Sequence, residues 1–501
     1  MASKIVWCCC VIGFLAAIQP SYIHPDEHFQ TLEVLMQEYY GIRGVRAWEF
    51  STDSPARSLA VLFLYYGPLF RFITDVLRLS DPIHILRAVR IYNTVLFLLA
   101  INYTLLRLVK KSRKDVFLLV VSSYITWTYQ SHSFTNSMET ILLLVVLTIF
   151  NDINNGQNGL LQILTCGILI AIGTFTRITF PTFLILPGIK LFGTLNPQRI
   201  KVLLVLLLAF LPACLLLIKA DTKYFNSGDY VIAPLNNLKY NLDSSHLEEH
   251  GLHPRYTHLL VNIPAMIGPG VLSLLNHKQP WLAIPNLSII SGLLFLSIMP
   301  HQELRFLIPI LPLLLINFNF SSVKFIRASK LLSLWFLFNA VMLLVMGVVH
   351  QGGIIPVLAK INKDESDLHV DIWWKTYSPP TWMYMNKNLT VSTTNIVDDI
   401  EYINNIDCSI ANDHVVDLKG CDMCLLKETL QGFQQNNVKE IRLIYPLTMI
   451  NNDKFSKFIQ GISEEYRVSY IYQGGYHLDL DHLDIFGQKI LGIGAIRISF
   501  S

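Results

Sequence analysis

The sequence IVWCCCVIGFLAAIQPSYIHPDEHFQ, residues 5–30, decides how the chain is interpreted. Its first part is apolar and close to the roughly 20 residues that a helix needs to cross a bilayer. Its second part places His24, Asp26, Glu27 and His28 directly after the apolar run. The stretch lacks the small-residue cleavage site of a signal peptide, so we interpret the apolar run as an uncleaved first span.

The composition extends this pattern to the whole chain. Of 501 residues, 52% are hydrophobic and 15% are charged, and the mean hydropathy is +0.43. Apolar runs of near-spanning length recur, which predicts an all-α polytopic membrane protein. The net charge of +3 is too small to argue for nucleic acid as a partner. We expect eleven spans, near residues 4–20, 88–108, 115–132, 137–150, 159–176, 180–194, 200–219, 257–276, 281–299, 305–320 and 331–350.

Residues 59–79 form an ambiguous apolar run. Arg71, Asp75 and Arg78 recur on one side of it at helical spacing, which is typical of an amphipathic helix lying in the membrane interface. Counting the run as interfacial puts KKSRKD, TLNPQRIK and SSVKFIRASK on the side of the N-terminus, and the positive-inside rule makes that side cytosolic. The lumenal side then receives HPDE, Arg177, the loop 220–256, HQELRF and the chain after residue 350.

The chain after residue 350 is polar and changes element type. The segments IRLIYPL, RVSYIYQ and AIRIS have strand character, and a helical pattern, KFSKFIQGISEEY, separates the first two. We therefore predict a transmembrane domain, residues 1–350, with a first lumenal loop at 21–87, and a small α/β lumenal domain, residues 351–501.

Two features of the predicted lumenal domain concern covalent chemistry. Asn388, in NLT, is a sequon in clearly polar sequence and a candidate for N-glycosylation. Cys408, Cys421 and Cys424 also lie there, and the pattern CDMC is half of a metal site without a second pair. A disulfide is therefore favoured over zinc if this domain faces an oxidising lumen.

The adjacent acids Asp26 and Glu27 are the first candidate site. Neighbouring residues point in different directions in both helices and strands, so one carboxylate can face a cavity while the other makes a structural contact. The alternative is that both begin and cap an interfacial helix, DEHFQTLEVLMQEYYG. The spacing does not choose between the two acids as a base.

Further ionisable residues gather at the ends of spans on the same side. Arg305 stands at the start of an apolar run, where it either anchors to lipid phosphate or binds the phosphate of a substrate. Arg177 is flanked by apolar residues and needs a partner or water, because an isolated charge at that depth is costly. The other candidates are His301 and Glu303 beside Arg305, Asp221 at a span end, and His253 before the next span.

This inventory suits a lipid-linked anionic substrate, since it supplies cations for a phosphate and a carboxylate to accept a proton. The exterior loops contain no DxD motif, and the chain shows neither a Walker loop nor a Rossmann fingerprint. A metal-dependent enzyme using a nucleotide sugar is therefore not predicted.

Five motifs carry a family resemblance. HPDEHFQTLEVL, WEF followed by ARS, DTKYF with PLNNLKYN, HGLHPRYTHLLVNIP and HQELRFLIPILP, in this order, resemble the motifs of the endoplasmic-reticulum α-mannosyltransferases that use dolichyl-phosphate mannose, glycosyltransferase family 22 with the GT-C fold. The match runs from about residue 20 to about residue 320. YIHPDEHFQTLEV and WEFSTDSPARS most resemble the branch that adds the fourth mannose to the glycosylphosphatidylinositol (GPI) precursor, and GGYHLDLDHLDIFG resembles the end of that branch. Gln302 departs from the family, where many relatives carry lysine.

The resemblance implies an activity and roles for the candidate residues. It implies inverting α-1,2 transfer of mannose from dolichyl-phosphate mannose to the third mannose of a trimannosyl GPI lipid, without a metal or other cofactor, at the lumenal face of the endoplasmic-reticulum membrane. Asp26 is then the base, with Glu27 as the second candidate. Arg305, aided by His301 and Arg177, would bind the donor phosphate. The expected substrate-positioning residues are His24, Asp221, His253 and Glu303.

The sequence leaves two alternative functions open. A related enzyme would add the third GPI mannose or a mannose of the lipid-linked N-glycan precursor. A transporter or scramblase would place its charges in the middle of several spans, whereas this chain places them at span ends and in loops.

Overall fold

The chain forms two compact units. The computed structural model describes residues 2–109, 112–157, 159–194, 196–242, 251–274, 280–323, 326–363, 370–393, 412–478 and 491–500. The first unit comprises Met1–Ile18, Ala47–Phe70 and Val89–Leu343, and the second comprises Gln19–Arg46, Arg71–Ala88 and Leu344–Ser501. The predicted domains follow chain order, whereas the second unit combines the C-terminal region with parts of the predicted first loop. Parts of the predicted connections, of the loop 220–256 and of GGYHLDLDHLDIFG lie outside the described residues.

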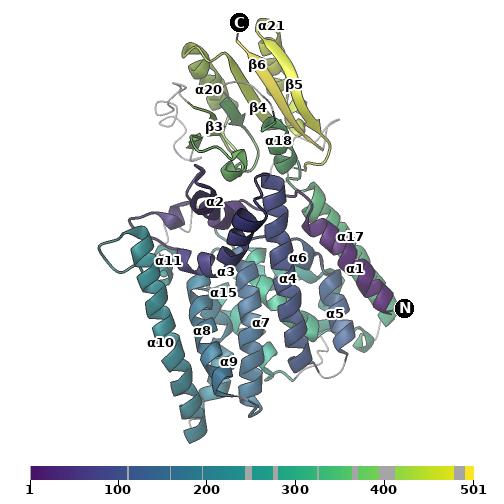
Figure 1. The fold of residues 1–501 in the computed structure, drawn as a ribbon. Helices are drawn as coiled ribbons and strands as arrows, with labels where there is room; N and C mark the ends of the chain where they lie inside the picture. The colour runs from purple at the N-terminus through teal and green to yellow at the C-terminus, as the bar shows by residue number, and fades with distance from the viewer. Residues whose placement is uncertain are drawn as a thin grey trace. The chain divides into compact units, whose positions relative to one another are not determined.

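The first unit is helical, as predicted (Figure 1). Its helices are α1 (Ala2–Ala17), α3 (Leu59–Arg71), α4 (Pro82–Leu108), α5 (Arg113–Ser122), α6 (Tyr124–Trp127), α7 (Thr135–Asn154), α8 (Leu160–Thr176), α9 (Ile185–Phe192), α10 (Pro197–Phe225), α11 (Ala233–Leu242), α13 (Ile263–Ile267), α14 (Val271–Leu274), α15 (Ile284–Ile298), α16 (Leu311–Ile316) and α17 (Ala328–Leu344). Short 3-10 or π turns join them: η2 (Trp48–Phe50), η4 (Phe180–Phe183), η5 (His258–Asn262), η6 (Gly268–Gly270), η7 (Leu304–Ile310) and η8 (Phe320–Ser322).

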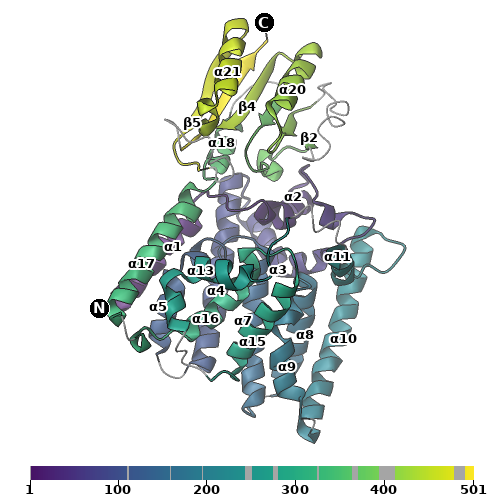
Figure 2. The same cartoon turned by 180° about the vertical axis from the view of Figure 1, so that it is seen from behind.

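Burial separates a central helix from a peripheral one. The apolar window of α7 is 83% buried, whereas that of α10 is 17% buried. α8 packs between these two helices (Figures 1 and 2). The exposed leucines of α10 give it the apolar surface that a lipid-facing helix requires. α7 therefore forms the interior of the unit and α10 its lipid-facing side.

Several predicted spans are interrupted helices. The run 115–132 breaks at Ser123, whose backbone is extended, and 180–194 is divided between η4 and α9. The run 257–276 breaks at Gly268, which has a φ of +47° that an L side chain rarely adopts. The expected count of eleven spans stays a prediction.

Within the described residues, five helices are long and apolar enough to cross a membrane. They are Leu59–Val76, Pro82–Leu108, Thr135–Asn154, Pro197–Phe225 and Ala328–Val349. The first of these covers most of residues 59–79, which the sequence places in the interface. By length and composition this helix meets the requirement for crossing, so its interfacial position is not confirmed.

The second unit contains a mixed β-sheet. In its described residues the strand order is β2-β3-β1-β4-β6-β5. β1 pairs in parallel with β3 and β4, and β2 pairs in parallel with β3, whereas β6 is antiparallel to both β4 and β5. The strands are β1 (Val370–Trp373), β2 (Thr390–Thr393), β3 (His414–Asp417), β4 (Glu440–Pro446), β5 (Arg467–Gly474) and β6 (Ile493–Ser499). The α/β class, the three predicted strands and the predicted helix, α21 (Asp453–Glu465), are confirmed.

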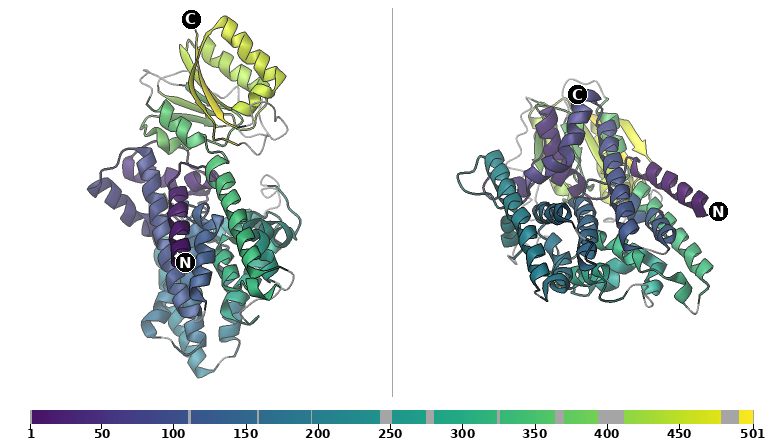
Figure 3. Two further views of the ribbon diagram at one scale, coloured as in Figure 1. Left: turned by 90° about the vertical axis from the view of Figure 1, so that its right-hand side faces the viewer. Right: turned by 60° about the horizontal axis from the view of Figure 1, so that its bottom comes forward.

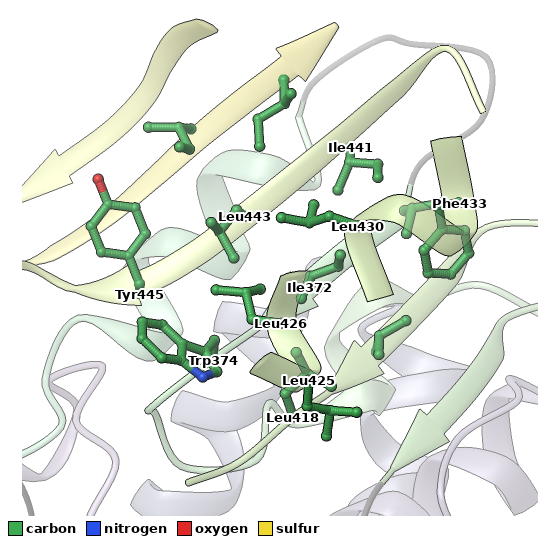
Figure 4. Packing of buried hydrophobic residues seen from close by; sticks show 14 of the residues in the cluster. Ile372, Trp374, Leu418, Leu425, Leu426, Leu430, Phe433, Ile441, Leu443 and Tyr445 are labelled. Carbon is green, nitrogen blue, oxygen red and sulfur yellow. The ribbon is translucent and has the colours of Figure 1, made fainter. Parts of the chain in front are cut away.

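Helices cover both faces of this sheet. α20 (Met423–Gln435) and α21 lie on one face, as Figure 2 and the left panel of Figure 3 show. Alternate strand residues, among them Ile372 and Leu443, point toward α20 and meet Leu426 (Figure 4). On the other face Arg442 donates from Nη1 to the carbonyl of Ile361 at 3.1 Å, at the end of α18 (Ile354–Ile361).

Further helical segments of the second unit come from the N-terminal third of the chain. η1 (His28–Leu32) leads into α2 (Glu33–Tyr40), which ends at Gly41 in the left-handed conformation. η3 (Phe72–Val76) continues α3. The hydroxyl of Tyr40 donates to the carbonyl of Leu79 at 2.9 Å and thereby connects these two segments.

A buried ion pair crosses the centre of the sheet. Asp371 of β1 accepts from Arg442 of β4 at 2.5 Å (Oδ1 to Nε) and 2.9 Å (Oδ2 to Nη2). The hydroxyl of Tyr384 donates to Asp371 Oδ2 at 2.8 Å. Both charged side chains are at least 95% buried, so each relies on the other for compensation.

We predict that Asp371→Ala destabilises the second unit by about 3–5 kcal/mol, because it leaves the Arg442 charge buried without its carboxylate. Thermal unfolding of the detergent-solubilised full chain measures the effect. Glu440→Ala is the matched control, since it removes the carboxylate of a partly exposed pair with Arg497 on the same sheet, where a loss of about 0–1 kcal/mol is expected. Equal shifts in the two variants would contradict the prediction.

Candidate active site

The HPDE segment begins a helix, which the sequence offered as the alternative interpretation of its two acids. The amides of His28 and Phe29 both donate to the carbonyl of Pro25, at 2.9 and 3.0 Å. The fixed φ of proline suits the first position of a helix, so Pro25 favours this start. The chain then forms the π-helical turn η1 before α2. π-helical turns are rare in proteins, and those that occur are often found at functional sites.

Asp26 and Glu27 differ in exposure. The side chain of Asp26 is 22% exposed, and its Oδ2 accepts from Gln30 Nε2 at 2.5 Å. The side chain of Glu27 is fully buried, and its Oε2 lies 3.8 Å from Nε2 of His28. Glu27 makes no side-chain cap to the described first turn. The two acids therefore face different environments, as expected for neighbours on a helix.

His24 lies beside Asp26. Its Nδ1 accepts the backbone N–H of Asp26 at 3.2 Å and lies 3.5 Å from Asp26 Oδ1. Its ring also contacts the ring of Tyr377, with centroids 6.4 Å apart. Within the second unit, the structure thus groups His24, Asp26 and Glu27.

The C-terminal segment 377–384 packs against the HPDE segment. Trp382 Nε1 donates to His28 Nδ1 at 3.2 Å, and the hydroxyl of Tyr22 donates to the carbonyl of Ser378 at 2.6 Å. The rings of Tyr22 and His28 stack with centroids 5.0 Å apart and planes at 8°. Sequence reasoning missed this partner, for which the aromatic and proline-rich run TYSPPTWMY was the available signal.

Glu33 attaches α2 to the same C-terminal segment. Its Oε1 accepts from Thr381 Oγ1 at 2.9 Å and from the backbone N–H of Trp382 at 3.1 Å. Burial raises the pKa of Glu33 to about 8, although these hydrogen bonds act in the opposite direction. Glu33 therefore holds a proton in the folded protein near neutral pH.

In the first unit, Glu303 joins a histidine and an arginine. It accepts from His301 Nε2 at 2.7 Å and from Arg305 Nη2 at 2.9 Å. Nδ1 of His301 lies 3.1 Å from the carbonyl oxygen of Gly251, so both ring nitrogens face acceptors. Burial disfavours the imidazolium, but the hydrogen bond and charge of Glu303 outweigh it and raise the pKa of His301.

Arg177 has partners inside the protein. Its Nε lies 3.2 Å from Glu139 Oε2, and its Nη1 donates to Thr135 Oγ1 at 3.1 Å. Both partners belong to α7. The guanidiniums of Arg177 and Arg305 lie 5.4 and 5.8 Å from the centre of the Phe306 ring. Three predicted phosphate ligands, Arg177, His301 and Arg305, thus converge around Phe306.

A further arginine that sequence reasoning missed joins this group. Arg57 Nη1 donates to the same Thr135 hydroxyl at 3.1 Å, and Arg57 Nε lies 3.5 Å from Glu49 Oε1. Glu49 and Arg57 belong to WEF and ARS, motifs that carried the family resemblance but received no role. The available signal was that an acidic residue and a basic residue occur in two motifs a few positions apart.

His253 lies beside the His301 ring, whereas Asp221 supports a helix. The two histidine rings are 5.8 Å apart, and His253 Nδ1 accepts the backbone N–H of Gln302 at 3.4 Å. The buried Asp221 accepts the N–H of Ala60 at the start of α3, at 2.9 Å. This contact accounts for a carboxylate at the end of α10.

The structure explains why glutamine can stand at position 302, where many members of the resembled family carry lysine. Its Oε1 accepts the N–H of His258 at 2.9 Å, and its Nε2 donates to carbonyls that include Met299, at 3.1 Å. Lysine can donate to carbonyls but cannot accept an N–H. Gln302 therefore connects the loop before Arg305 to the start of η5 in a way that lysine cannot.

The remaining predicted features fall in the second unit. Asn388 is exposed, and its use as a glycosylation site stays a prediction. Cys424 is an exposed free thiol, Cys421 is buried, and Cys408 lies outside the described residues, so the disulfide hypothesis also stays a prediction. In the part of the chain that the structure describes, no group of three His, Cys, Asp or Glu side chains is arranged to hold a metal ion.

Comparison with known sequences gives one consistent result. Residues 4–386 match the Alg9-like mannosyltransferase family. The chain is 46% identical to GPI mannosyltransferase 4 of Candida glabrata, over 100% of both proteins. It is 42% identical to the protein of that name in Saccharomyces cerevisiae, over 94% of both, and 38% identical to that in Candida albicans, over 97% of both.

Comparison with solved structures concerns the fold. The crystal structure of ArnT from Cupriavidus metallidurans bound to undecaprenyl phosphate superimposes with a TM-score of 0.52, covering 98% of this chain and 97% of that one. The apo structure of the same protein gives the same score. Since identity is 8%, the likeness supports the expected GT-C fold class and nothing finer.

We predict that Glu33→Gln removes a pH dependence of stability. The pKa of Glu33 is about 8 in the folded state against an ordinary 4.5. Its contribution is therefore complete below pH 4.5 and is lost as the pH rises toward 8, because the unfolded chain releases the proton first. Wild-type melting temperature should fall relative to that of Glu33→Gln between pH 5 and pH 8.

The exposed Glu38, on the same helix, supplies the control. Glu38→Gln should retain the wild-type pH profile. Parallel melting curves for wild type and Glu33→Gln across this range would show that Glu33 is ionised in the folded protein, against the prediction.

Proposed function

Because the chain belongs to the Alg9-like mannosyltransferase family, we propose that it adds the fourth mannose to the GPI precursor, with dolichyl-phosphate mannose as donor. That the chain is a mannosyltransferase follows from its family. The observation that carries the finer assignment is 46% identity, over the full length of both chains, to a protein named GPI mannosyltransferase 4. The same name recurs among the other relatives described above, which favours this step over the third GPI mannose or the N-glycan precursor.

The proposed reaction is an inverting α-1,2 transfer to the third mannose of a trimannosyl GPI lipid. A β-linked donor and an α-linked product require a single displacement at C1. The acceptor hydroxyl loses a proton as it attacks, so a base must be within hydrogen-bond reach. The leaving phosphate gains negative charge, which fixed cations stabilise. This scheme needs no metal, and endoplasmic-reticulum localisation with a lumenal site is part of the proposal.

Asp26 is the proposed base. Its carboxylate is partly exposed, whereas that of Glu27 is fully buried. A base has to reach a hydroxyl on a substrate that enters from outside the protein, so exposure favours Asp26. Glu27 remains the second candidate, and His24 positions substrate or the Asp26 carboxylate through its 3.5 Å contact.

Arg305, Arg177 and His301 are the proposed ligands of the donor phosphate. The side chains of Arg305 and Arg177 are 11% and 10% exposed, so they act in surroundings where charge interactions are strong. Their carboxylate partners, Glu303 and Glu139, hold them in place before substrate arrives. Cations fixed in this way lose little energy to reorganisation when charge develops on the phosphate.

Two further residues are proposed to position substrate. His253 is exposed beside the His301 ring, where it can donate to a sugar hydroxyl or a phosphate. Asp221 acts indirectly by holding the N-terminus of α3, which follows the Arg57 motif. Glu303 orients both His301 and Arg305.

We predict that Asp26→Asn abolishes transfer, because an amide cannot accept the proton of the acceptor hydroxyl. The measurement is in vitro transfer from dolichyl-phosphate mannose to a defined trimannosyl GPI, with and without a chelator. Glu38→Gln is the matched control and should retain full activity. Wild-type activity in Asp26→Asn would remove this residue from the role, and loss of activity in the chelator would contradict the metal-free scheme.

We predict that Arg305→Ala raises the KM for dolichyl-phosphate mannose by roughly tenfold or more, since a charge-assisted contact to phosphate is worth about 1.5–3 kcal/mol. The KM for the trimannosyl acceptor should change much less. Arg327→Ala, at an exposed arginine of the same unit, is the control. An equal rise in both KM values would count against phosphate binding by Arg305.

A further inference from the structure

We propose that Trp382 is a positioning residue for the HPDE motif: through the hydrogen bond of its indole to His28, it sets the orientation of Glu27 and thereby presents Asp26 as the base. The inference rests on the proposed function of Asp26. It assigns a role in the reaction to the C-terminal region, 354 residues along the chain from His28.

The first step is the tautomer of His28. The indole N–H of tryptophan is a donor only, and it points at His28 Nδ1 at 3.2 Å. Nδ1 must therefore carry a lone pair and not a proton. A doubly protonated imidazolium would set two N–H groups against each other, so His28 is neutral with its proton on Nε2.

The second step is that two aromatic side chains hold the His28 ring, one on its face and one through the hydrogen bond at its edge. Tyr22 stacks on it at 5.0 Å with planes at 8°, and the Trp382 ring lies 6.2 Å away with planes at 30°. Tyr22 is itself held by its hydrogen bond to Ser378. All three rings are buried, so rotation of the imidazole would require this packing to open.

The third step links His28 to the acids. With the proton on Nε2, the positive end of the N–H dipole faces Glu27 Oε2 at 3.8 Å. Glu27 is fully buried, so its carboxyl group is confined to the interior of the unit beside this N–H. Glu27 thus stays on the inner side of the turn, and the next residue toward the N-terminus, about 100° around the helix, faces outward. That residue is Asp26.

The anchorage of the segment continues beyond Trp382. The backbone N–H of Trp382 and the hydroxyl of Thr381 both donate to Glu33. The hydroxyl of Thr381 also accepts the N–H of Val45 at 3.0 Å. Trp382 is therefore fixed by its own backbone, and removal of the indole N–H alone leaves that anchorage in place.

The test compares two buried tryptophans of the same unit. Trp382→Phe keeps a ring but removes the N–H. Trp374→Phe is the matched control, because Trp374 is equally buried and its Nε1 donates to the carbonyl of Cys421 at 2.9 Å, within the core under α20. Both variants should lose similar stability.

The expected readout separates positioning from folding. In the transfer assay, per folded molecule, Trp382→Phe should lower kcat by about tenfold or more with both KM values within about twofold of wild type, because a misplaced base costs rate and not binding. Trp374→Phe should keep wild-type kcat. Equal kcat per folded molecule in the two variants would overturn the proposal.

The variant His28→Phe keeps the test decisive if Trp382→Phe does not fold, and it completes a double-mutant cycle where Trp382→Phe folds. His28→Phe retains the stacked ring but accepts no hydrogen bond, so it should lower kcat to a similar extent, and the double variant should lose little more. Wild-type kcat in His28→Phe would overturn the proposal. Asp26→Asn in the same assay keeps the two hypotheses apart: full activity there removes the base, whereas inactivity there with wild-type kcat in Trp382→Phe removes only the positioning role.

Discussion

A guanidinium among apolar helices must meet a carboxylate or water, and this requirement organises the first unit. Arg177 meets it through Glu139 and Thr135 of α7, and Thr135 also accepts from Arg57. One hydroxyl therefore connects the loop before α3, the start of α7 and the end of α8. Removing one member of a buried pair costs about 3–5 kcal/mol, so these elements are fixed together by charged groups that include the proposed phosphate ligand Arg177.

The second unit also contains buried polar groups, but these are satisfied by hydrogen bonds and need not be charged. Glu33 is buried and holds its proton near neutral pH, and His28 is neutral because an indole donates to it. Both contacts end on the short segment Thr381–Trp382. A neutral buried network avoids the desolvation penalty of an ion pair and still fixes direction, since each donor needs a matching acceptor. The HPDE turn is thus held by geometry more than by charge.

The sequence predicted what depends on local order and missed what depends on contacts between distant segments. The sequence DEHFQTLEV offered a helix start as one of two interpretations, and the structure contains that start. HQELRF supplied His301, Glu303 and Arg305 as candidates, but their pairing on Glu303 was not predicted. The pairing of Arg57 with Thr135 joins residues 78 positions apart, and no periodicity reports it. Likewise, the strand β1 is only four residues long, which is too short for a periodic pattern to stand out in the sequence. The sequence GPG, residues 268–270, indicated the helix break at Gly268, but the span was predicted from the hydropathy of a longer run that includes it.

The difference between Asp26 and Glu27 illustrates how burial decides a question that composition leaves open. Both acids have the same functional group, and neighbouring positions on a helix separate their directions by about 100°. Once Tyr22, His28 and Trp382 fill one side of the turn, the residue on that side is enclosed and the other is exposed. A hydroxyl that arrives from outside reaches an exposed carboxylate more readily than an enclosed one. The aromatic packing, and not the acid itself, therefore decides which of the two acids is partly exposed, and this exposure is why Asp26 is the proposed base.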